Sequence, residues 1–426
     1  MPSMTFLPSR QSMQRWSIPA LTALFGLLPA WWAFPQGVGF WRSWAILSGW
    51  LASGLLLASL LLMIREPRLA GLLGGLQRMY LWHHHAGVLA YLLLLTHPLA
   101  LAADGWQHSP HRAWLAISPW QGGATIATGW LALLLMMAGL ALAFAHRIPY
   151  ELWRRLHHLL SASTLAGAAH LLLLGLPQPL LWLPALAIGF LLWRFLRADR
   201  GLGARPYVVD RVARLSGTVM EVTLRPLGEA LHPNGGQFLL AAFGEGIHYH
   251  GCREYHPFTV ERTAANGAIV LAIKSLGDCT GALQDVEPGV AVRLQGPFGN
   301  FLDREPHGPG LWIAGGIGIT PFLSVLQRRT LRYPVRLFYL YRSGADAPYL
   351  AELEALAGNC PLLHIECIET GADNPDLEAL LPAPADLSGV ECHICGPAPM
   401  AMSATVQLRR RGVAPERIHF EQFDFR

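Results

Sequence analysis

Apolar residues are concentrated in the first 200 positions of this 426-residue chain. Hydrophobic residues make up 52% of the sequence and charged residues only 14%, a balance that is abnormal for a soluble protein. A helix needs about 17–25 mostly apolar residues to cross a bilayer. Segments of this kind predict a bundle of six transmembrane helices over Ile18–Phe34, Trp44–Ile64, Tyr80–Ala102, Ala124–Ala145, Leu152–Leu174 and Leu180–Leu196.

The first apolar segment has a second interpretation, as a secretory signal preceded by Arg10 and Arg15. Trp31, Trp32 and Phe34, however, occupy positions where a signal cleavage site has small residues. We therefore prefer a transmembrane helix for this segment.

Arginines give the expected orientation, because positively charged loops stay in the cytoplasm. With a cytoplasmic N-terminus, the outer loops carry only Arg42 and Arg112. The inner segments then carry Arg10, Arg15, Arg65, Arg68, Arg78, Arg147, Arg154, Arg155, Arg194, Arg197 and Arg200. Everything after Arg197 is therefore expected in the cytoplasm.

All six cysteines follow Arg197, and a reducing compartment predicts free thiols there rather than disulfides. Cys392 and Cys395 have the spacing of half a zinc site, but no second half follows. The net charge of +4 is small and its basic residues are scattered, so we expect no nucleic-acid binding.

Two of the apolar segments contain histidines, and four of these are candidate haem ligands, because ionisable side chains within a membrane are costly and usually functional. His83 and His97 are fourteen residues apart, within roughly 40° on one helix face and about 21 Å along its axis. The other segment offers His157 or His158 near one face and His170 near the opposite face. His157 and His170 are thirteen residues apart and about 140° from each other, and the spacing from His158 is scarcely better, so a kink or π-bulge is expected. Two helices with histidines near each membrane face could ligate two haems stacked across the bilayer.

Other histidines have plainer interpretations, since a single imidazole in a bundle can be hydrogen-bonded, bind a metal or relay protons. Three lie near the membrane interface and are taken as ordinary interfacial residues: His84, His85 and His158. The outer loop 103–123 contains His108, His111 and Arg112. These could gather an anionic or metal-bearing acceptor, or form an ordinary solvated loop.

After Pro206 the hydrophobic period changes to two, and short β-branched runs alternate with glycine-containing turns. Several short strands at this spacing predict a small antiparallel β-barrel. The runs begin at Tyr207, Thr218, Gly235, His256, Ala268 and Val290.

Beyond the barrel, buried strands alternate with helical stretches, which predicts a doubly wound α/β domain with a parallel sheet. The first strand leads directly into Gly315–Pro321, a glycine-rich turn that opens a helix. Such a turn brings backbone N–H groups and a helix N-terminus to a pyrophosphate. The expected domains are 1–200 (transmembrane), 201–303 (β-barrel) and 304–426 (α/β nucleotide-binding).

Together these motifs resemble the ferric reductase and NADPH oxidase superfamily over nearly the whole chain, in a bacterial NADPH-oxidase-like form. The first part resembles a ferric-reductase-like transmembrane domain, and the second a ferredoxin–NADP reductase type module. The flavin-binding motif of that module matches His256, Pro257, Phe258 and Thr259. Its pyrophosphate segment matches Lys274, the only lysine of the chain, with Gly277 and Thr280. The resemblance therefore implies FAD in the barrel domain.

The nicotinamide nucleotide segments of the same family match Gly315, Gly316, Gly318, Thr320, Pro321, Cys395, Gly396 and Pro397. Arg342 matches an arginine that binds the 2′-phosphate in relatives, which implies NADPH, with NADH as an alternative. Relatives also stack a C-terminal aromatic ring on the flavin. Phe423 is the candidate for this ring, with Phe425 as the alternative, and Phe423 and Cys395 are the candidate catalytic residues.

In this family the haem ligands pair across helices. The resemblance implies that His83 and His157 hold the inner of two b-type haems, while His97 and His170 hold the outer one. Two positions depart from animal oxidases. Ser163 replaces an aromatic residue between the haems, and Leu101 replaces a histidine near the oxygen site. These departures leave the electron path intact but argue against superoxide production.

The implied function is electron transfer from cytoplasmic NADPH, through FAD and two b-type haems, to an extracytoplasmic acceptor such as a ferric chelate. One alternative is an NADPH oxidase that reduces O2 to superoxide. Another is a membrane subunit that donates electrons to a periplasmic partner protein. A non-enzymatic haem sensor would not need the flavin and nucleotide segments. The resemblance also implies a multi-pass protein of a bacterial inner membrane.

Overall fold

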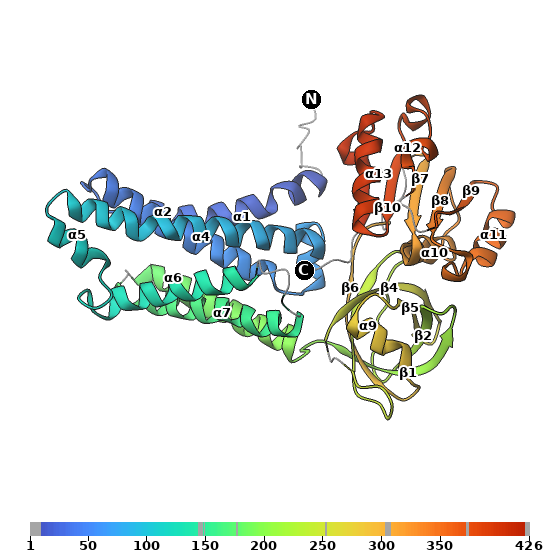
Figure 1. Cartoon of the computed structure of the whole chain (residues 1–426), viewed down its shortest axis with the longest axis horizontal. Helices are drawn as coiled ribbons and strands as arrows, with labels where there is room; N and C mark the ends of the chain where they lie inside the picture. The colour runs from blue at the N-terminus through green and yellow to red at the C-terminus, as the bar shows by residue number, and fades with distance from the viewer. Residues whose placement is uncertain are drawn as a thin grey trace, which may run out of the picture. The chain divides into compact units, whose positions relative to one another are not determined.

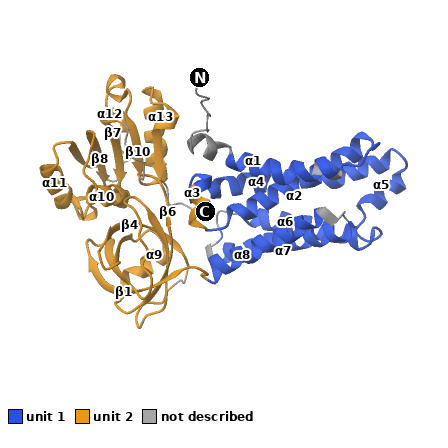
Figure 2. Cartoon of the chain, turned by 180° about the vertical axis from the view of Figure 1, so that it is seen from behind, with its two compact units in different colours: residues 1–65, 72–200 blue, residues 66–71, 201–426 orange. Residues whose placement is uncertain are grey.

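The computed structural model describes residues 10–143, 148, 150–175, 178–251, 254–302, 308–371 and 375–421. The chain divides into two compact units (Figure 2). Unit 1 comprises residues 1–65 and 72–200, and unit 2 comprises residues 66–71 and 201–426. The described part of unit 1 is helical, and every strand of the described residues belongs to unit 2.

The helices of unit 1 follow the apolar segments of the sequence (Figure 1). They are α1 (Arg10–Ala33), α2 (Phe40–Leu62), α4 (Leu76–Trp106), α5 (Pro110–Ile117), α6 (Gly123–Ala143), α7 (Tyr150–Leu173) and α8 (Trp182–Arg194). The short helix α3 (Pro67–Leu73) crosses the boundary between the units. Within unit 1, α2 packs mainly against α4, and α6 packs mainly against α7. Each helix that carries predicted haem ligands therefore has an apolar neighbour.

Among the described residues, three helices are long and apolar enough to span a membrane: α2, α4 and α6. In α1 the apolar stretch is limited to Ser17–Pro29. Helix α8 has 13 residues and is extended by a 3₁₀ turn before it and a π-helical turn after it. Length and composition thus support membrane spans by these three helices, while the count of six spans remains a prediction.

Small residues allow helices of unit 1 to approach closely. A Cβ on Gly54 of α2 would overlap the backbone of Gly26 on α1. Close backbone approach of this kind is the usual way in which membrane helices gain packing contacts. Gly54 therefore fixes where α1 crosses α2.

Unit 2 begins with the predicted antiparallel barrel. Its strands are β1 (Arg205–Arg214), β2 (Val219–Pro226), β3 (Phe238–Phe243), β4 (His256–Thr263), β5 (Ile269–Lys274) and β6 (Ala291–Phe298). They close in the order β1-β2-β5-β4-β3-β6, with a short helix α9 (Asp278–Ala282) after β5. Side chains that alternate along the strands, such as Tyr207 and Val209, fill the barrel. The period-two pattern predicted this barrel correctly.

A five-stranded parallel sheet follows. Its strands are β7 (Gly310–Gly315), β8 (Val335–Tyr341), β9 (Leu363–Glu369), β10 (Glu391–Cys395) and β11 (Ile418–Glu421), in the order β11-β10-β7-β8-β9. Helices α10 (Thr320–Leu326), α11 (Leu350–Asn359), α12 (Leu377–Leu380) and α13 (Ala398–Arg410) connect them. The doubly wound α/β prediction is confirmed, with β11 as an additional strand that the sequence analysis did not identify.

Candidate functional site

The first pair of predicted haem ligands, His83 on α4 and His157 on α7, lie opposite each other within unit 1. Their ring centres are 6.5 Å apart, and the ring planes are inclined at 62°. An imidazole nitrogen binds a metal such as zinc at about 2 Å, so two rings on opposite sides of one ion have centres roughly 6 Å apart. The spacing of the two rings therefore fits bis-histidine ligation of a haem iron.

Three of the four predicted ligands use ring atom Nδ1 to contact a backbone carbonyl of a neighbouring helix. The Nδ1–carbonyl oxygen distances are 2.7 Å for His97 to Ala45, 2.7 Å for His170 to Thr125, and 3.1 Å for His83 to Ser59. A carbonyl can only accept, so Nδ1 carries the hydrogen in the rings of His97 and His170, and Nε2 is left to coordinate. Metal-bound histidines almost always donate their second ring N–H in this way. His83 Nδ1 lies closer to the Ser59 hydroxyl, at 2.7 Å, which can donate or accept.

Two glycines make room for the predicted outer ligands. Gly49 lies one turn after Ala45 on α2, and a Cβ there would be 3.1 Å from His97 Nδ1. Gly129 lies one turn after Thr125 on α6, and a Cβ there would be 3.1 Å from His170 Cε1. The α2–α4 and α6–α7 pairs thus repeat one arrangement: an accepting carbonyl, a glycine one turn later, and a histidine ring against both. This repetition supports a common site for His97 and His170.

The predicted inner pair is less symmetric. His157 stacks on Trp153, with ring centres 4.8 Å apart and planes inclined at 22°. Its Nδ1 is buried and has no hydrogen-bond partner among the described residues. Helix α7 is α-helical over all of 150–173, so of the two expected irregularities, a kink or a π-bulge, the π-bulge is absent. The large angle between His157 and His170 around α7 lets the two rings contact different helices. The His157 ring faces His83 on α4, and the His170 ring contacts a carbonyl of α6.

A second candidate site lies at the carboxyl edge of the parallel sheet. The chain passes from β7 through β8 to β9 on one side, and then returns to β10 and β11 on the other. In open α/β sheets, ligands bind outside the carboxyl ends of the strands at such a reversal. Here the reversal lies between β7 and β10, which end at Gly315 and Cys395. Both predicted nucleotide segments, 315–321 and 395–397, therefore begin at the same place.

Most of the predicted glycines in these segments allow the turn after β7 and the turn after β10 to pack closely against each other. A Cβ on Gly318 would overlap the backbone of Cys395, and a Cβ on Gly396 would lie 3.0 Å from the Gly315 Cα. Thr320 Oγ1 donates to the Ile317 carbonyl at 3.0 Å and so closes the turn before α10. Pro321 and Pro397 stand at the starts of α10 and α13, where the missing N–H costs nothing.

Gly316 differs from its neighbours because its φ is +54°. Among the described residues, the atom closest to a Cβ placed there is Lys274 Nζ, at 3.7 Å. The side chain of Lys274, the only lysine of the chain, therefore reaches the half-buried Gly316 in this turn. A cation beside a glycine-rich turn that opens a helix is a suitable arrangement for phosphate.

The predicted flavin motif and the pyrophosphate segment lie together in the barrel. Ligand atoms of Glu254, His256 and Cys279 are all within 4.8 Å of one another, which places the start of β4 beside α9. Thr280 Oγ1 accepts hydrogen bonds from the backbone N–H groups of Leu276 (2.9 Å) and Gly277 (3.0 Å). The Thr280 hydroxyl therefore shapes the loop itself. Following His256 and Pro257 on β4, Phe258 and Thr259 are buried in the barrel wall.

The remaining predicted residues stand around the sheet edge. Arg342 follows β8 and is exposed. Cys395 is 1% exposed, and burial raises the pKa of its thiol, which keeps it neutral. Phe423 and its alternative Phe425 lie outside the described residues.

Sequence reasoning did not identify Glu421, which ends β11 directly beside Cys395 in the parallel register. Its side chain is buried, and Oε2 has no hydrogen-bond partner within the described part of the chain. Burial raises the pKa of this carboxyl to about 8. A protonated carboxyl at the ligand-binding edge of the sheet can donate a hydrogen bond or exchange a proton there. The only sequence signal is its place two residues before Phe423.

Comparisons with known proteins find different relatives for the helical part of the chain and for the part that contains the barrel and the sheet. Residues 48–168 match the family model described as ferric reductase like transmembrane component. The match includes His83, His97 and His157, and it ends two residues before His170.

The chain is also 26% identical over 235 residues to the reductase component of propane 2-monooxygenase from Rhodococcus jostii (strain RHA1), covering 50% of this chain and 62% of that protein. It is 35% identical over 140 residues to phenoxybenzoate dioxygenase subunit beta from Ectopseudomonas oleovorans, covering 33% and 42%. The chain thus spans less than two thirds of either relative. A crystal structure of an Amycolatopsis cytochrome P450 reductase has a TM-score of 0.43 at 22% identity, covering 52% of this chain and 69% of that chain.

Proposed function

We propose that this chain, which joins a ferric-reductase-like transmembrane component to a ferredoxin–NADP reductase type module, is an NAD(P)H-dependent transmembrane oxidoreductase. It carries electrons from NADPH on the cytoplasmic side, through FAD and two b-type haems, to an acceptor on the other side. A ferric chelate is the acceptor that we favour. The chain then lies in a bacterial inner membrane, with unit 2 in the cytoplasm.

The observation that carries this proposal is the set of four histidines in unit 1. The His83 and His157 ring centres are 6.5 Å apart, as two ligands of one iron require. The Nδ1 atoms of His97 and His170 each contact a backbone carbonyl oxygen at 2.7 Å, and this contact supports coordination through Nε2. Ordinary packing histidines in a bundle would not need this repeated arrangement.

FAD, when bound, links the two-electron chemistry of nicotinamide to the one-electron chemistry of haem. The residues of unit 2 serve to bind and orient the two dinucleotides. The position of Lys274 Nζ beside Gly316 supports a role for these residues in binding phosphate. We assign Arg342, which is exposed after β8, to a 2′-phosphate. Buried Cys395 and Glu421 border the point where a nicotinamide would enter the sheet edge.

Anaerobic reduction tests the proposal. The purified full chain with FAD, mixed with NADPH under nitrogen, should show reduction of a haem Soret band. In the His97→Ala variant, about half of the haem per flavin should be lost, whereas NADPH should still bleach the flavin absorbance. His111→Ala, on α5, should change neither quantity and is the matched control.

The electron acceptor is then identified with the same purified protein, by one assay under nitrogen and another in air. Ferric citrate with a ferrous chelator should give colour under nitrogen, while cytochrome c reduction in air should be insensitive to superoxide dismutase. Dismutase-sensitive reduction would favour the oxidase, and haem reduction with neither signal would favour a periplasmic partner protein. Colourless protein from cells supplied with haem would contradict the proposal itself.

A further inference from the structure

Three side chains that can ligate a metal ion meet where β4 begins beside α9. They are Glu254, two residues before the strand, His256, its first residue, and Cys279 in α9. One carboxylate oxygen, one imidazole nitrogen and the thiol sulfur all lie within 4.8 Å of one another. Among the described residues, no other group of three or more histidine, cysteine or acidic side chains converges in this way. The function proposed above gives Glu254 and Cys279 no role.

The separations of these atoms are close to those of ligands on a single zinc ion. Zinc binds sulfur at about 2.3 Å, and nitrogen or oxygen at about 2.0–2.2 Å, in a tetrahedral arrangement. Two ligand atoms on one such ion are therefore roughly 3.3–3.8 Å apart. With every separation already at or below 4.8 Å, the three side chains need to move by only about 1 Å to close on one ion.

The backbone holds two of the three ligands in place. His256 pairs with Ala241 of β3 in the antiparallel ladder of the barrel. Cys279 lies in a turn that hydrogen bonds close, because Thr280 Oγ1 accepts from the Gly277 backbone N–H at 3.0 Å. The Gly277 carbonyl in turn accepts from the backbone N–H of Gly281 at 2.7 Å. The imidazole and the thiol are therefore brought together by the fold rather than by a mobile loop.

The ligand set favours zinc over calcium or magnesium, because a thiolate and an imidazole are soft ligands. One carboxylate and one thiolate also cancel the charge of a divalent cation. Glu254 is 8% exposed, and a carboxylate removed from water attracts a cation more strongly than one at the surface. His256 and Cys279 are half-buried, so an ion can reach them from solvent.

We propose that Glu254, His256 and Cys279 bind a Zn²⁺ ion and leave its fourth coordination position to water. On binding, the Cys279 thiol releases its proton to solvent and the sulfur bonds to the ion, with no change of oxidation state. This site goes beyond the proposed function, which uses no metal ion in unit 2.

The consequence for flavin binding rests on the proposed function. His256 begins the predicted flavin motif, and Cys279 lies within the predicted pyrophosphate segment between Gly277 and Thr280. A zinc ion that holds these two side chains together opposes the entry of FAD between the same segments. Zinc therefore slows or prevents flavin loading of the barrel.

Equilibrium dialysis of the purified full chain, without FAD or a histidine tag, against buffered Zn²⁺ measures the site directly. Cys279→Ser and Glu254→Gln should each raise the zinc dissociation constant at least about 10-fold, because even the loss of a group that only supports a ligand costs about 10–100-fold. X-ray absorption at the zinc edge should show one sulfur at about 2.3 Å in the parent chain and none in Cys279→Ser. Circular dichroism checks that both variants are folded.

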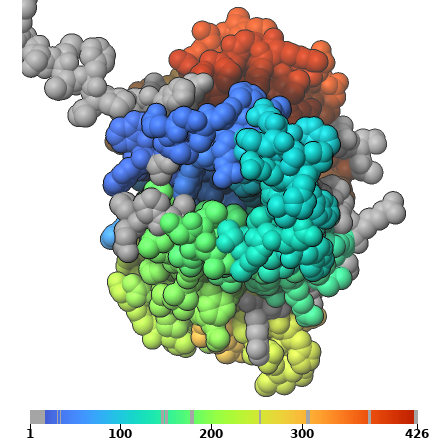
Figure 3. All heavy atoms as spheres, turned by 90° about the vertical axis from the view of Figure 1, so that its left-hand side faces the viewer, coloured from blue at the N-terminus to red at the C-terminus, as the bar shows by residue number. Residues whose placement is uncertain are grey.

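Exposed side chains elsewhere can also bind zinc, so two further variants are matched controls. Cys367→Ser removes an exposed thiol from β9. His111→Gln removes an exposed imidazole from α5, whose chain is cyan in Figure 3. Neither change should alter the dissociation constant or the sulfur signal. The proposal would be overturned by a sulfur signal that persists in Cys279→Ser, by equal dissociation constants in all five proteins, or by a parent chain that binds no zinc.

Titration of FAD into the full chain at several zinc concentrations tests the consequence for flavin. Zinc should raise the half-saturating FAD concentration, and FAD should raise the zinc dissociation constant by the same factor, because coupling between two sites is reciprocal. Both effects should be lost in Cys279→Ser. Equal FAD binding with and without zinc would overturn this part of the proposal. Failure of the proposed function is distinguishable, since NADPH would then not reduce haem, while dialysis and X-ray absorption would still report on the zinc site.

Discussion

At the scale of single residues, Glu421 shows how a strand end can change the chemistry of a carboxyl group. The strand β11 ends beside β10, and this pairing carries the carboxyl into the protein next to Cys395. Burial raises its pKa from 4.5 to about 8, so the folded chain binds this proton more tightly than the unfolded chain does. The resulting stabilisation is complete below pH 4.5 and is lost as the pH rises through 8.

We predict that Glu421→Gln weakens the pH dependence of unit 2 stability, because the variant has no proton to lose. The melting temperature of the full chain, followed by the fluorescence of released FAD, should fall between pH 5 and pH 8 in the parent protein and fall less in the variant. Between pH 5 and pH 8, the loss of unfolding free energy in the parent should exceed that in the variant by a few kcal/mol at most. Glu416→Gln changes an exposed glutamate nearby and should leave the slope unaltered. Parallel pH curves for all three proteins would refute the argument.

At the scale of secondary-structure elements, the helices α2 and α6 act as supports for the histidine-bearing helices α4 and α7. Each presents a carbonyl to an imidazole Nδ1 and a glycine to the same ring. A side chain on either glycine would push the imidazole away from its carbonyl. The orientation of the outer ligands therefore depends on two residues that do not coordinate.

Gly49→Val is expected to remove the outer haem selectively. A valine Cβ would lie within about 3.1 Å of His97 Nδ1, before its two methyl groups are counted. Haem per flavin should fall by about half, as in His97→Ala, while flavin reduction by NADPH should persist. Gly189→Val on α8 is the control for the lower helix propensity of valine, since no described atom lies within 4 Å of a Cβ there. Full haem content in Gly49→Val would show that the glycine is dispensable.

Regular periodicity made most elements predictable from the sequence. The barrel strands and the strands β7–β10 appear as short β-branched runs, and the glycine-rich turn marks the start of α10. The strand β11 has four residues, too few to show a period, so the position of Glu421 was not predictable. The supports Gly49 and Gly129 were also missed, because their role depends on which helices pair. Helix pairing is a tertiary property that a single apolar segment does not encode.

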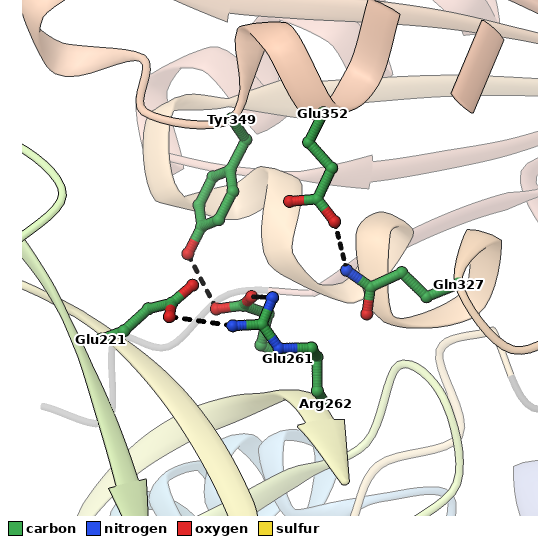
Figure 4. A network of polar contacts seen from close by, with 6 residues as sticks. All are labelled: Glu221, Glu261, Arg262, Gln327, Tyr349 and Glu352. Atoms are coloured by element: carbon green, nitrogen blue, oxygen red, sulfur yellow. Dashed lines mark hydrogen bonds and ion pairs between the residues drawn. The ribbon is translucent and has the colours of Figure 1, made fainter. Parts of the chain in front are cut away.

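At the scale of the whole molecule, electron transfer requires the barrel and the parallel sheet of unit 2 to keep their flavin and nucleotide segments together. A polar network joins them (Figure 4). On β4, Arg262 contacts Glu221 of β2 at 2.8 Å and Glu261 at 3.1 Å. Tyr349, immediately before α11, donates its hydroxyl to Glu261 at 2.8 Å. Burial and the neighbouring Glu221 raise the pKa of Glu261, whose side chain is 0% exposed.

The guanidinium of Arg262 keeps the carboxylates of Glu221 and Glu261 close to each other. Its loss should therefore weaken the polar network between the barrel and the sheet. In Arg262→Gln, the buried Glu261 keeps one hydrogen-bond donor, Tyr349, and faces Glu221 without a compensating charge. We expect a loss of roughly 1–3 kcal/mol in the stability of unit 2, because the guanidinium is partly exposed and a fully buried pair would cost more. For a domain of this size the FAD-release melting temperature should fall by about 3–10 °C.

Arg336→Gln provides the comparison, since it removes an ion pair to Glu366 at the surface of the same sheet, where such pairs contribute at most about 1 kcal/mol. If this polar network aligns the flavin with the nucleotide, flavin reduction by NADPH should be slower in Arg262→Gln at temperatures well below melting. Haem reoxidation by ferric citrate should not change. Equal melting temperatures and flavin reduction rates for the two variants would show that the barrel and the sheet are held by their apolar contacts alone. In that case the buried charges would contribute nothing to the alignment of the two dinucleotides.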